Sequence, residues 1–389
     1  MAVDNLLDPQ HLIALARQQT GLHDFDELPV DEPLQRLTKA LNEEANLNAT
    51  GREAWHHRIL NALMARLRAQ DWFTRKPEIL EEKIVAPLVI VGLTRTGTTL
   101  LQRLIASDTR FYSAAWWENR FPVPAADDVK GDKRIEMAKA EVAAILKASP
   151  ELAAIHPWDA LGADEDILLI DQTLMSTTSG TMACIPSYHA WIQDLDLKPA
   201  YGYLKKMLQF LQWQKNQRGV TGERWLLKTP MHLGHVDAIV ELFPDAQFIQ
   251  THREPTQTIP SYASMIYNLW LGVSDTSDAI EAGRSTSATM HHDLYRCMAE
   301  RDKLPEGRFY DVDFRETVSD PVGLLERIYK YFGIPMTDLA RQQMQAYMAS
   351  NPREKRPAHN YTLEQFGFTD AGVKERFKEY RRRYIDPSA

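Results

Sequence analysis

Apolar positions recur at helical spacing through the first eighty residues. Asp8-Pro9 supplies an N-cap and a proline at the first helical position. A second start is Thr50, which forms a capping-box pattern with Glu53 and precedes an apolar stripe from Trp55 to Leu67. The pattern therefore predicts an N-terminal helical region over residues 1–83.

From residue 84 to about residue 335, short apolar runs alternate with helical patterns. We expect strands at Pro87–Gly92, Phe111–Glu118, Trp225–Lys228, Ala246–Thr251 and Gly307–Val312. Strands that alternate with helices through short loops imply right-handed crossovers and a parallel sheet, with ligands at the carboxyl ends of its strands. A helical insert is expected at about residues 130–220, and a tail with one docking helix at residues 336–389.

The first of these strands leads into a glycine-bracketed loop, Gly92-Leu-Thr-Arg95-Thr-Gly97-Thr98-Thr99. A strand, such a loop and a helix N-terminus form an anion cradle, because backbone N–H groups converge there and the helix dipole adds positive charge. The spacing is that of the P-loop, although Thr98 stands where that loop has its lysine. We therefore predict an α/β, P-loop NTPase-like three-layer fold with a central parallel sheet. The expected phosphate-binding residues are Arg95, Thr96, Gly97, Thr98 and Thr99.

Composition narrows the function classes. The 389 residues are 44% hydrophobic and 25% charged, which is ordinary for a globular protein. The net charge of −8 argues against a nucleic-acid partner. Cys184 and Cys297 show no metal spacing, and neither a signal peptide nor an apolar run long enough to span a bilayer is apparent. We expect a cytoplasmic protein with a small-molecule partner, and the sequence leaves a homo-oligomer open.

Two further loops follow predicted strands and carry suitable chemistry. Arg253 closes a strand, and Ser261 lies about two turns into the next helix, so the pair could grip a phosphate from two sides. Lys228 closes another strand, and His232 follows at the start of a helix. These two residues supply a mobile cation and a base that titrates near neutral pH.

Together the three loops resemble the PAPS-dependent sulfotransferases, which use 3′-phosphoadenosine-5′-phosphosulfate. The chain is most similar to a bacterial branch, through Gly92–Thr99, Leu227-Lys228-Thr-Pro230 and Phe243–Pro255, and the resemblance covers about residues 85–385. It implies that the first loop binds the 5′-phosphosulfate and that Arg253 and Ser261 hold the 3′-phosphate. Sulfuryl transfer from this donor to an acceptor hydroxyl requires no metal ion, which fits the missing P-loop lysine.

The identity of the general base stays open among three residues. Cytosolic members of this family carry a histidine two residues beyond the strand-end lysine, whereas here Pro230 occupies that position and His232 comes four residues beyond. Some carbohydrate sulfotransferases have a catalytic glutamate shortly after the first helix, which points to Glu118. A third candidate is Glu165, in a segment that also resembles the bacterial branch. Lys228 and Arg95 would stabilise charge on the leaving phosphate oxygen.

Two departures from the family pattern concern the nucleotide. Leu100 stands where the cytosolic enzymes have an adenine-stacking tryptophan. Their late phosphate-binding motif is absent, and Arg356, with Arg353 and Lys355, is the expected substitute. The acceptor is an unidentified small molecule, lipid or sugar, and tryptophans and tyrosines around Trp116, Tyr188 and Trp270 favour an apolar or ring-containing one. The alternatives are a P-loop kinase or hydrolase using ATP and Mg²⁺, and a non-catalytic nucleotide-binding protein.

Overall fold

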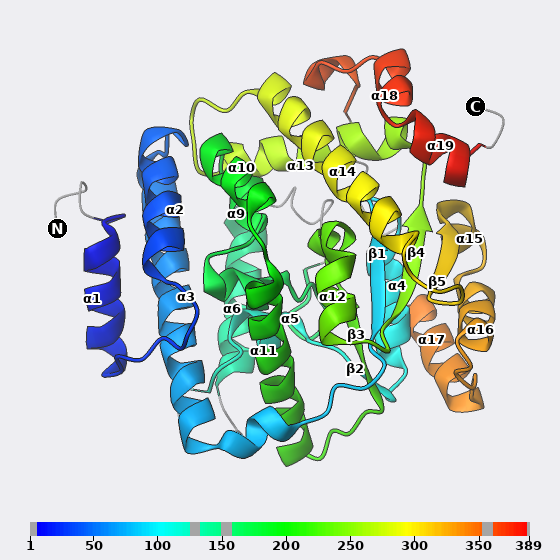
Figure 1. Cartoon of the computed structure of the whole chain (residues 1–389), viewed down its shortest axis with the longest axis horizontal. Coiled ribbons are helices and arrows are strands. Elements are labelled where there is room, and N and C mark those ends of the chain that lie inside the picture. Colours follow the sequence, from blue (N-terminus) through cyan, green and yellow to red (C-terminus); the bar gives the residue numbers. More distant parts are fainter. Residues whose placement is uncertain (1–5, 125–132, 149–157, 352–360, 387–389) are drawn as a thin grey trace.

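The computed structural model describes residues 6–124, 133–148, 158–351 and 361–386 (Figure 1). Arg353, Lys355 and Arg356, the expected late phosphate-binding residues, lie outside this part of the chain. At the centre is a five-stranded parallel sheet in the order β2-β3-β1-β4-β5, as the alternating pattern predicts. The strands are β1 (Leu88–Gly92), β2 (Phe111–Tyr112), β3 (Arg224–Lys228), β4 (Gln247–His252) and β5 (Phe309–Asp313).

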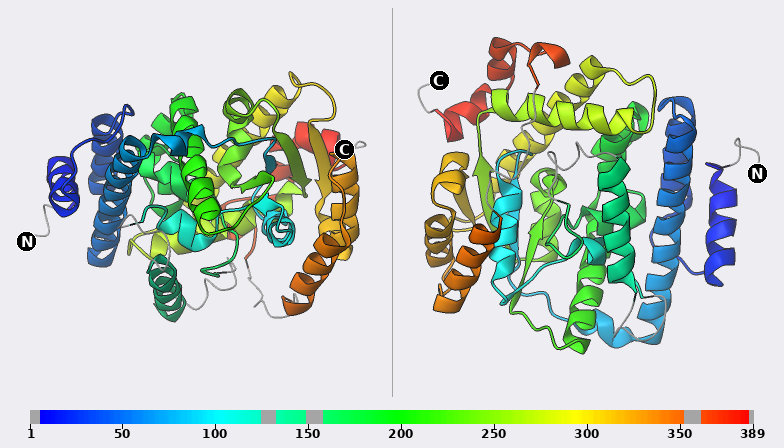
Figure 2. Two further views of the ribbon diagram at one scale, coloured as in Figure 1. Left: turned by 90° about the horizontal axis from the view of Figure 1, so that it is seen from below. Right: turned by 180° about the vertical axis from the view of Figure 1, so that it is seen from behind.

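Helices cover both faces of the sheet, which gives the predicted three layers (Figure 2). Leu88 and Ile90 of β1 pack with α4 (Thr98–Ser107), α16 (Pro321–Tyr331) and α17 (Asp338–Ser350). Val89 and Val91 belong to the larger core, which includes α11 (Lys198–Gln217), α12 (Val236–Leu242) and α14 (Ala279–Arg301). Successive residues of β1 thus face opposite layers, so the strand is apolar along its whole length.

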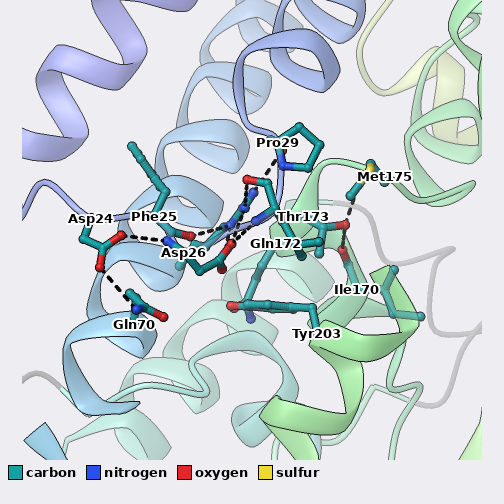
Figure 3. A network of polar contacts seen from close by, with 12 residues as sticks. Asp24, Phe25, Asp26, Pro29, Gln70, Ile170, Gln172, Thr173, Met175 and Tyr203 are labelled. Carbon is teal, nitrogen blue, oxygen red and sulfur yellow. Dashed lines mark hydrogen bonds and ion pairs between the residues drawn. The ribbon is translucent and has the colours of Figure 1, made fainter. Parts of the chain in front are cut away.

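The predicted N-terminal helices are α1 (Pro9–Thr20), α2 (Asp31–Glu43) and α3 (Ala49–Arg75), which lie together at one side of the molecule (Figure 1). Asp8 caps α1 as expected. The cap of α3 was placed wrongly: Asn48, not Thr50, accepts the bond from Gly51 N–H. The loop between α1 and α2 is held by the fully buried Arg66, whose guanidinium donates hydrogen bonds to the Asp26 carboxylate. Figure 3 shows Asp26 within the polar network at this loop.

Two predicted elements differ from the structure. The strand expected at Phe111–Glu118 ends after Tyr112, because α5 (Trp116–Arg120) begins where Glu118 accepts a bond from Ala115 N–H. The expected docking helix of the tail is two short helices, α18 (Asp370–Arg376) and α19 (Lys378–Tyr384), divided at Phe377. Phe377 and Tyr380 are nevertheless buried, so the tail packs on the domain as predicted.

Further helices complete the described part of the chain. There the expected insert contains α11 and also α6 (Arg134–Ala148), α8 (Ile167–Ile170), η3 (Asp171–Thr173), α9 (Thr178–Met182) and α10 (Pro186–Asp194). The remaining ones are η2 (Pro77–Glu81), η4 (Pro230–His235), α13 (Pro255–Leu271), α15 (Phe314–Ser319) and η6 (Glu364–Phe366).

Candidate active site

The loop between β1 and α4 is shaped by residues with unusual backbone conformations. Gly92 and Gly97 have φ angles of 147° and 89°, and a Cβ at Gly92 would lie 2.2 Å from Thr251 Oγ1 of β4. Arg95 also adopts positive φ, at 69°. The buried Thr96 hydroxyl is 2.6 Å from both Leu93 O and Thr251 Oγ1. These hydrogen bonds fix the conformation of the loop. Its backbone passes so close to Thr251 that only glycine fits at residue 92.

A pocket of about 180 Å³, the reaction pocket, opens at the carboxyl ends of β1 and β3. Its walls come from the glycine loop, the start of α4, the β3–η4 turn, α13 and the insert segment 165–181. The predicted site residues that line it are Arg95, Thr98, Thr99, Glu165 and Lys228. Parallel topology thus brings together residues that are up to 133 positions apart in the chain, Arg95 and Lys228 being the most distant pair.

Lys228 places a positive charge beside the start of α4. Its side chain is 2% exposed, and Nζ lies 3.2 Å from Thr99 Oγ1 and 2.7 Å from Glu165 Oε1. Asp166 Oδ2 accepts a bond from the backbone N–H of Lys228. The ammonium group is thereby fixed between the start of α4 and a carboxylate whose side chain is 27% exposed.

Glu165 reaches the pocket because its segment is anchored to the core. Gln102 of α4 donates to Asp164 O at 2.9 Å, and Asp164 N–H donates to Ala114 O. Arg103, also on α4, contacts Ala163 O and the buried Asp164 carboxylate. The same helix that begins at the glycine loop therefore sets the position of the carboxylate opposite it.

Arg253 and Ser261 lie beside the same loop. Arg95 Nε donates to Ser261 Oγ at 3.3 Å, and Arg253 donates to Arg95 O at 2.9 Å. The Arg253 guanidinium stands over the Phe314 ring, 4.0 Å from its centroid. Arg253 and Ser261 thus both contact Arg95, one through its backbone oxygen and the other through its side chain, at one edge of the cradle.

His232 is fully buried and does not belong to the pocket lining. Its Nδ1 lies 3.0 Å from Tyr201 Oη. Its Nε2 is 3.1 Å from Asp166 Oδ1, in an ion-pair contact that is not aligned as a hydrogen bond. His232 therefore lies outside the pocket. It contacts Asp166, which in turn accepts a hydrogen bond from the backbone of Lys228.

Glu118 is also held away from the reaction pocket. Its 2%-exposed carboxylate contacts Lys215 Nζ at 2.6 Å and Arg218 at 3.2 Å, and it accepts the bond from Ala115 N–H. It lines a different pocket, on the surface between α5 and α11. Among the three candidate bases, Glu165 is the one that the structure brings next to Lys228 and the glycine loop.

Several pocket residues escaped the sequence reasoning. Thr229 Oγ1 is buried and lacks a hydrogen-bond partner within the described residues, and the side chain lines the pocket beside Lys228. Tyr262 follows Ser261, and burial raises the pKa of its hydroxyl to about 12. Thr229 could have been predicted as a pocket residue, because it directly follows the lysine at the end of a strand. Nothing in the sequence distinguished Tyr262 from a core tyrosine.

Comparison with known proteins gives the family. A family model described as "Sulfotransferase family" matches residues 87–338, which include β1, the glycine loop, Lys228 and Arg253. The chain belongs to the sulfotransferase family. The matched segment ends at α17, so the N-terminal helices and the tail helices of this sulfotransferase lie outside it.

Similar proteins come from mycobacteria. The omega-hydroxy-beta-dihydromenaquinone-9 sulfotransferase Stf3 of Mycobacterium bovis is 24% identical over 338 residues, which are 84% of each chain. The crystal structure of the sulfotransferase STF1 from M. tuberculosis H37Rv has 30% identity and a TM-score of 0.82, covering 95% of this chain and 98% of the other. For STF9 from M. avium the identity is 27%, the TM-score 0.86, and the coverage 97% and 96%.

Two features are absent from the described residues. In this part of the chain no helix combines the length and apolarity that crossing a bilayer requires. Nor do three or more His, Cys, Asp or Glu side chains there converge in an arrangement that could hold a metal ion.

Proposed function

We propose that this sulfotransferase moves a sulfuryl group from PAPS to the hydroxyl of an apolar acceptor. The observation that carries the proposal is the position of Lys228 Nζ, between Thr99 at the start of α4 and Glu165. Sulfuryl transfer develops negative charge on the leaving phosphate oxygen and releases a proton from the acceptor hydroxyl. A lysine at the anion cradle suits the first group, and a carboxylate beside it suits the second.

The described residues fit this donor. Backbone N–H groups around Gly97 and the N-terminus of α4 suit the 5′-phosphosulfate. Arg253 and Ser261 suit a 3′-phosphate, because a guanidinium group binds phosphate with parallel charge-assisted hydrogen bonds. Both lie within reach of Arg95 at the edge of the cradle. Arg356, outside the described residues, remains proposed as a further phosphate contact.

When bound, PAPS supplies the sulfuryl group and a phosphate oxygen that leaves with the bonding electron pair. The acceptor oxygen bonds to sulfur as the bond between sulfur and that phosphate oxygen breaks. Lys228 stabilises the charge on the leaving oxygen, and Glu165 accepts the proton of the acceptor hydroxyl. Recruitment of Lys228 by the leaving oxygen weakens its ion pair with Glu165, so the carboxylate becomes free to act as base.

We assign the base to Glu165 rather than to His232 or Glu118. A general base needs its acceptor atom within hydrogen-bond distance of the substrate proton. Glu165 lines the reaction pocket, whereas His232 is fully buried and Glu118 is saturated by two cations. His232 is then a positioning residue that acts through Asp166 on Lys228.

The acceptor side of the pocket is largely apolar. Ile167, Tyr262 and Met265 line the pocket, together with Thr177, Thr178 and Thr181. A mycobacterial relative is named for a hydroxylated menaquinone, and such a molecule combines an apolar body with a hydroxyl. Both features support an apolar, hydroxyl-bearing acceptor. The two cysteines are unpaired, which supports the cytoplasmic setting that we also propose.

Replacement of Arg253 tests the donor assignment. Arg253→Ala should weaken binding of 3′,5′-adenosine bisphosphate by about 1.5–3 kcal/mol, the value of a lost hydrogen bond to a charged group. Adenosine 5′-phosphosulfate, which lacks the 3′-phosphate, should bind both proteins almost equally in calorimetry. Arg315→Ala removes an exposed arginine paired with Asp313 and serves as the control. Equal losses for both nucleotides would contradict the role, and tighter binding of ATP with Mg²⁺ would favour a kinase.

A further inference from the structure

A second, smaller cavity of about 40 Å³ adjoins the reaction pocket, and we call it the inner chamber. The two cavities share walls formed by Gly92, Thr94, Thr177, Thr181, Pro230, Met231 and Tyr262. Tyr262 Oη of α13 and Thr181 Oγ1 of α9 are 3.4 Å apart, so this pair forms a rim between the cavities. The inner chamber thus lies next to the reaction pocket, in which the acceptor hydroxyl must lie.

One face of α14 closes the far side of the inner chamber. Ser285, Thr286, Thr289, Met290 and Asp293 line it, at positions that follow the helical repeat. The nearer walls are apolar and come from Leu93, Met231, Leu233 and Ile266. A narrow space with apolar residues on these walls and polar ones on α14 suits the end of a slender apolar chain that carries a polar group.

The far wall presents a hydroxyl without a hydrogen bond. Thr286 is 1% exposed, and its Oγ1 finds no partner within the described residues. Its neighbour on the same face, Thr289, is engaged, since His189 Nε2 lies 2.7 Å from Thr289 Oγ1. Because burial lowers the pKa of His189, this pair stays uncharged at neutral pH. Buried hydroxyls are nearly always paired in native proteins, so a lone one that lines a cavity points to a ligand.

We propose that the inner chamber binds the distal end of the acceptor, and that this end carries a hydroxyl or carbonyl oxygen held by Thr286. The acceptor class is a slender apolar molecule with oxygen at both ends. Its reacting hydroxyl lies beside Lys228 and Glu165, its apolar body passes the rim formed by Tyr262 and Thr181, and its second oxygen meets α14. This inference deepens the proposed function and rests on it.

Simple alcohols of graded length provide the probes. The protein with bound 3′,5′-adenosine bisphosphate is titrated by calorimetry with α,ω-alkanediols from 1,6-hexanediol to 1,10-decanediol, and with the 1-alkanols of equal carbon number. One or two diols of matching length should bind about tenfold more tightly than their 1-alkanols. That preference should vanish in Thr286→Val, which keeps the shape of the side chain, and persist in Thr286→Ser.

The matched control is Thr74→Val, which should bind the alcohols as the parent does. Thr74 is a helical threonine that lines neither cavity, and its hydroxyl donates to Gln70 O. Thermal unfolding should show that Thr286→Val is no less stable than the parent, because the substitution removes an unpaired buried hydroxyl. Equal binding of diols and 1-alkanols at every length, or a preference that survives in Thr286→Val, would overturn the inference. Binding of 3′,5′-adenosine bisphosphate is measured first, in a titration of its own, and its absence there would instead contradict the proposed function.

Discussion

Two glutamates of this chain are paired with lysines at nearly equal distance. Glu165 lies 2.7 Å from Lys228, and Glu118 lies 2.6 Å from Lys215. The Glu165 side chain is 27% exposed and lines the reaction pocket. Glu118 is 2% exposed, and both of its oxygens are engaged, by Lys215, by Arg218 and by a backbone N–H.

The comparison teaches that the distance between two charges does not reveal what they do. A buried carboxylate with every oxygen satisfied stabilises a local structure, and it has no lone pair to offer a substrate. A carboxylate with one strong partner at the edge of a cavity keeps capacity to accept a proton. Access to the pocket and hydrogen-bond saturation therefore separate the proposed base from a structural ion pair.

The largest effect is expected from Glu165→Gln, which keeps the shape of the side chain but cannot accept the proton. The turnover number kcat should fall by about 10²–10⁴-fold, the usual contribution of a general base. The affinity for 3′,5′-adenosine bisphosphate should change little. Steady-state rates with PAPS and calorimetry measure the two quantities. A turnover within threefold of the parent would remove Glu165 from the mechanism.

Glu118→Gln should act on stability instead. The substitution leaves Lys215 and Arg218 without their carboxylate, and breaking such a buried pair costs about 3 kcal/mol. Urea denaturation should show this loss in the free energy of unfolding, while kcat of the folded fraction stays near that of the parent. A catalytic Glu118 would give the reverse result, with an unchanged unfolding midpoint and a large loss of turnover.

The sequence was sufficient where local rules apply. Apolar runs located β1, β3, β4 and β5, and the glycine spacing located the cradle, because strand burial and positive φ leave direct marks on residue choice. It was insufficient for Glu118, whose lysine partner is 97 positions away on α11. The same carboxylate caps α5, and the helix begins where the apolar pattern predicts a continuing strand.

His235 is a buried histidine outside the reaction pocket, and its burial predicts how the stability of the protein depends on pH. Desolvation lowers the pKa of His235 to about 4, although Asp293 opposes the shift. An unfolded chain binds this proton near pH 6.5, so the stability from His235 is present above that pH and is lost as the pH falls toward 4. The loss should be about 1.4 kcal/mol per pH unit between these values.

His235→Asn removes this titration. Urea denaturation of the parent and the variant at pH 7, 6 and 5 should show that stability falls less steeply in the variant as the medium is acidified. Identical slopes for the two proteins would show that His235 is not the group responsible.

The smallest catalytic effect is expected from His232→Gln. His232 contacts Asp166 and Tyr201 but not the pocket, so its loss shifts Lys228 only indirectly. The turnover number should fall by less than about tenfold, and the pH dependence of kcat should keep its shape. A change in the shape of this pH dependence would identify His232 as the general base in place of Glu165.

The register of the sheet has a consequence for how the protein is made. Gly92 pairs with Thr251, and β1 lies between β3 and β4, which leave the ribosome long after it. The glycine loop cannot take its final curve until β4 has been synthesised. During that interval the apolar β1 lacks its neighbours, which exposes the nascent chain to aggregation and makes folding slow. Growth at low temperature or added chaperones should therefore raise the yield of the protein more than a solubilising change on its surface.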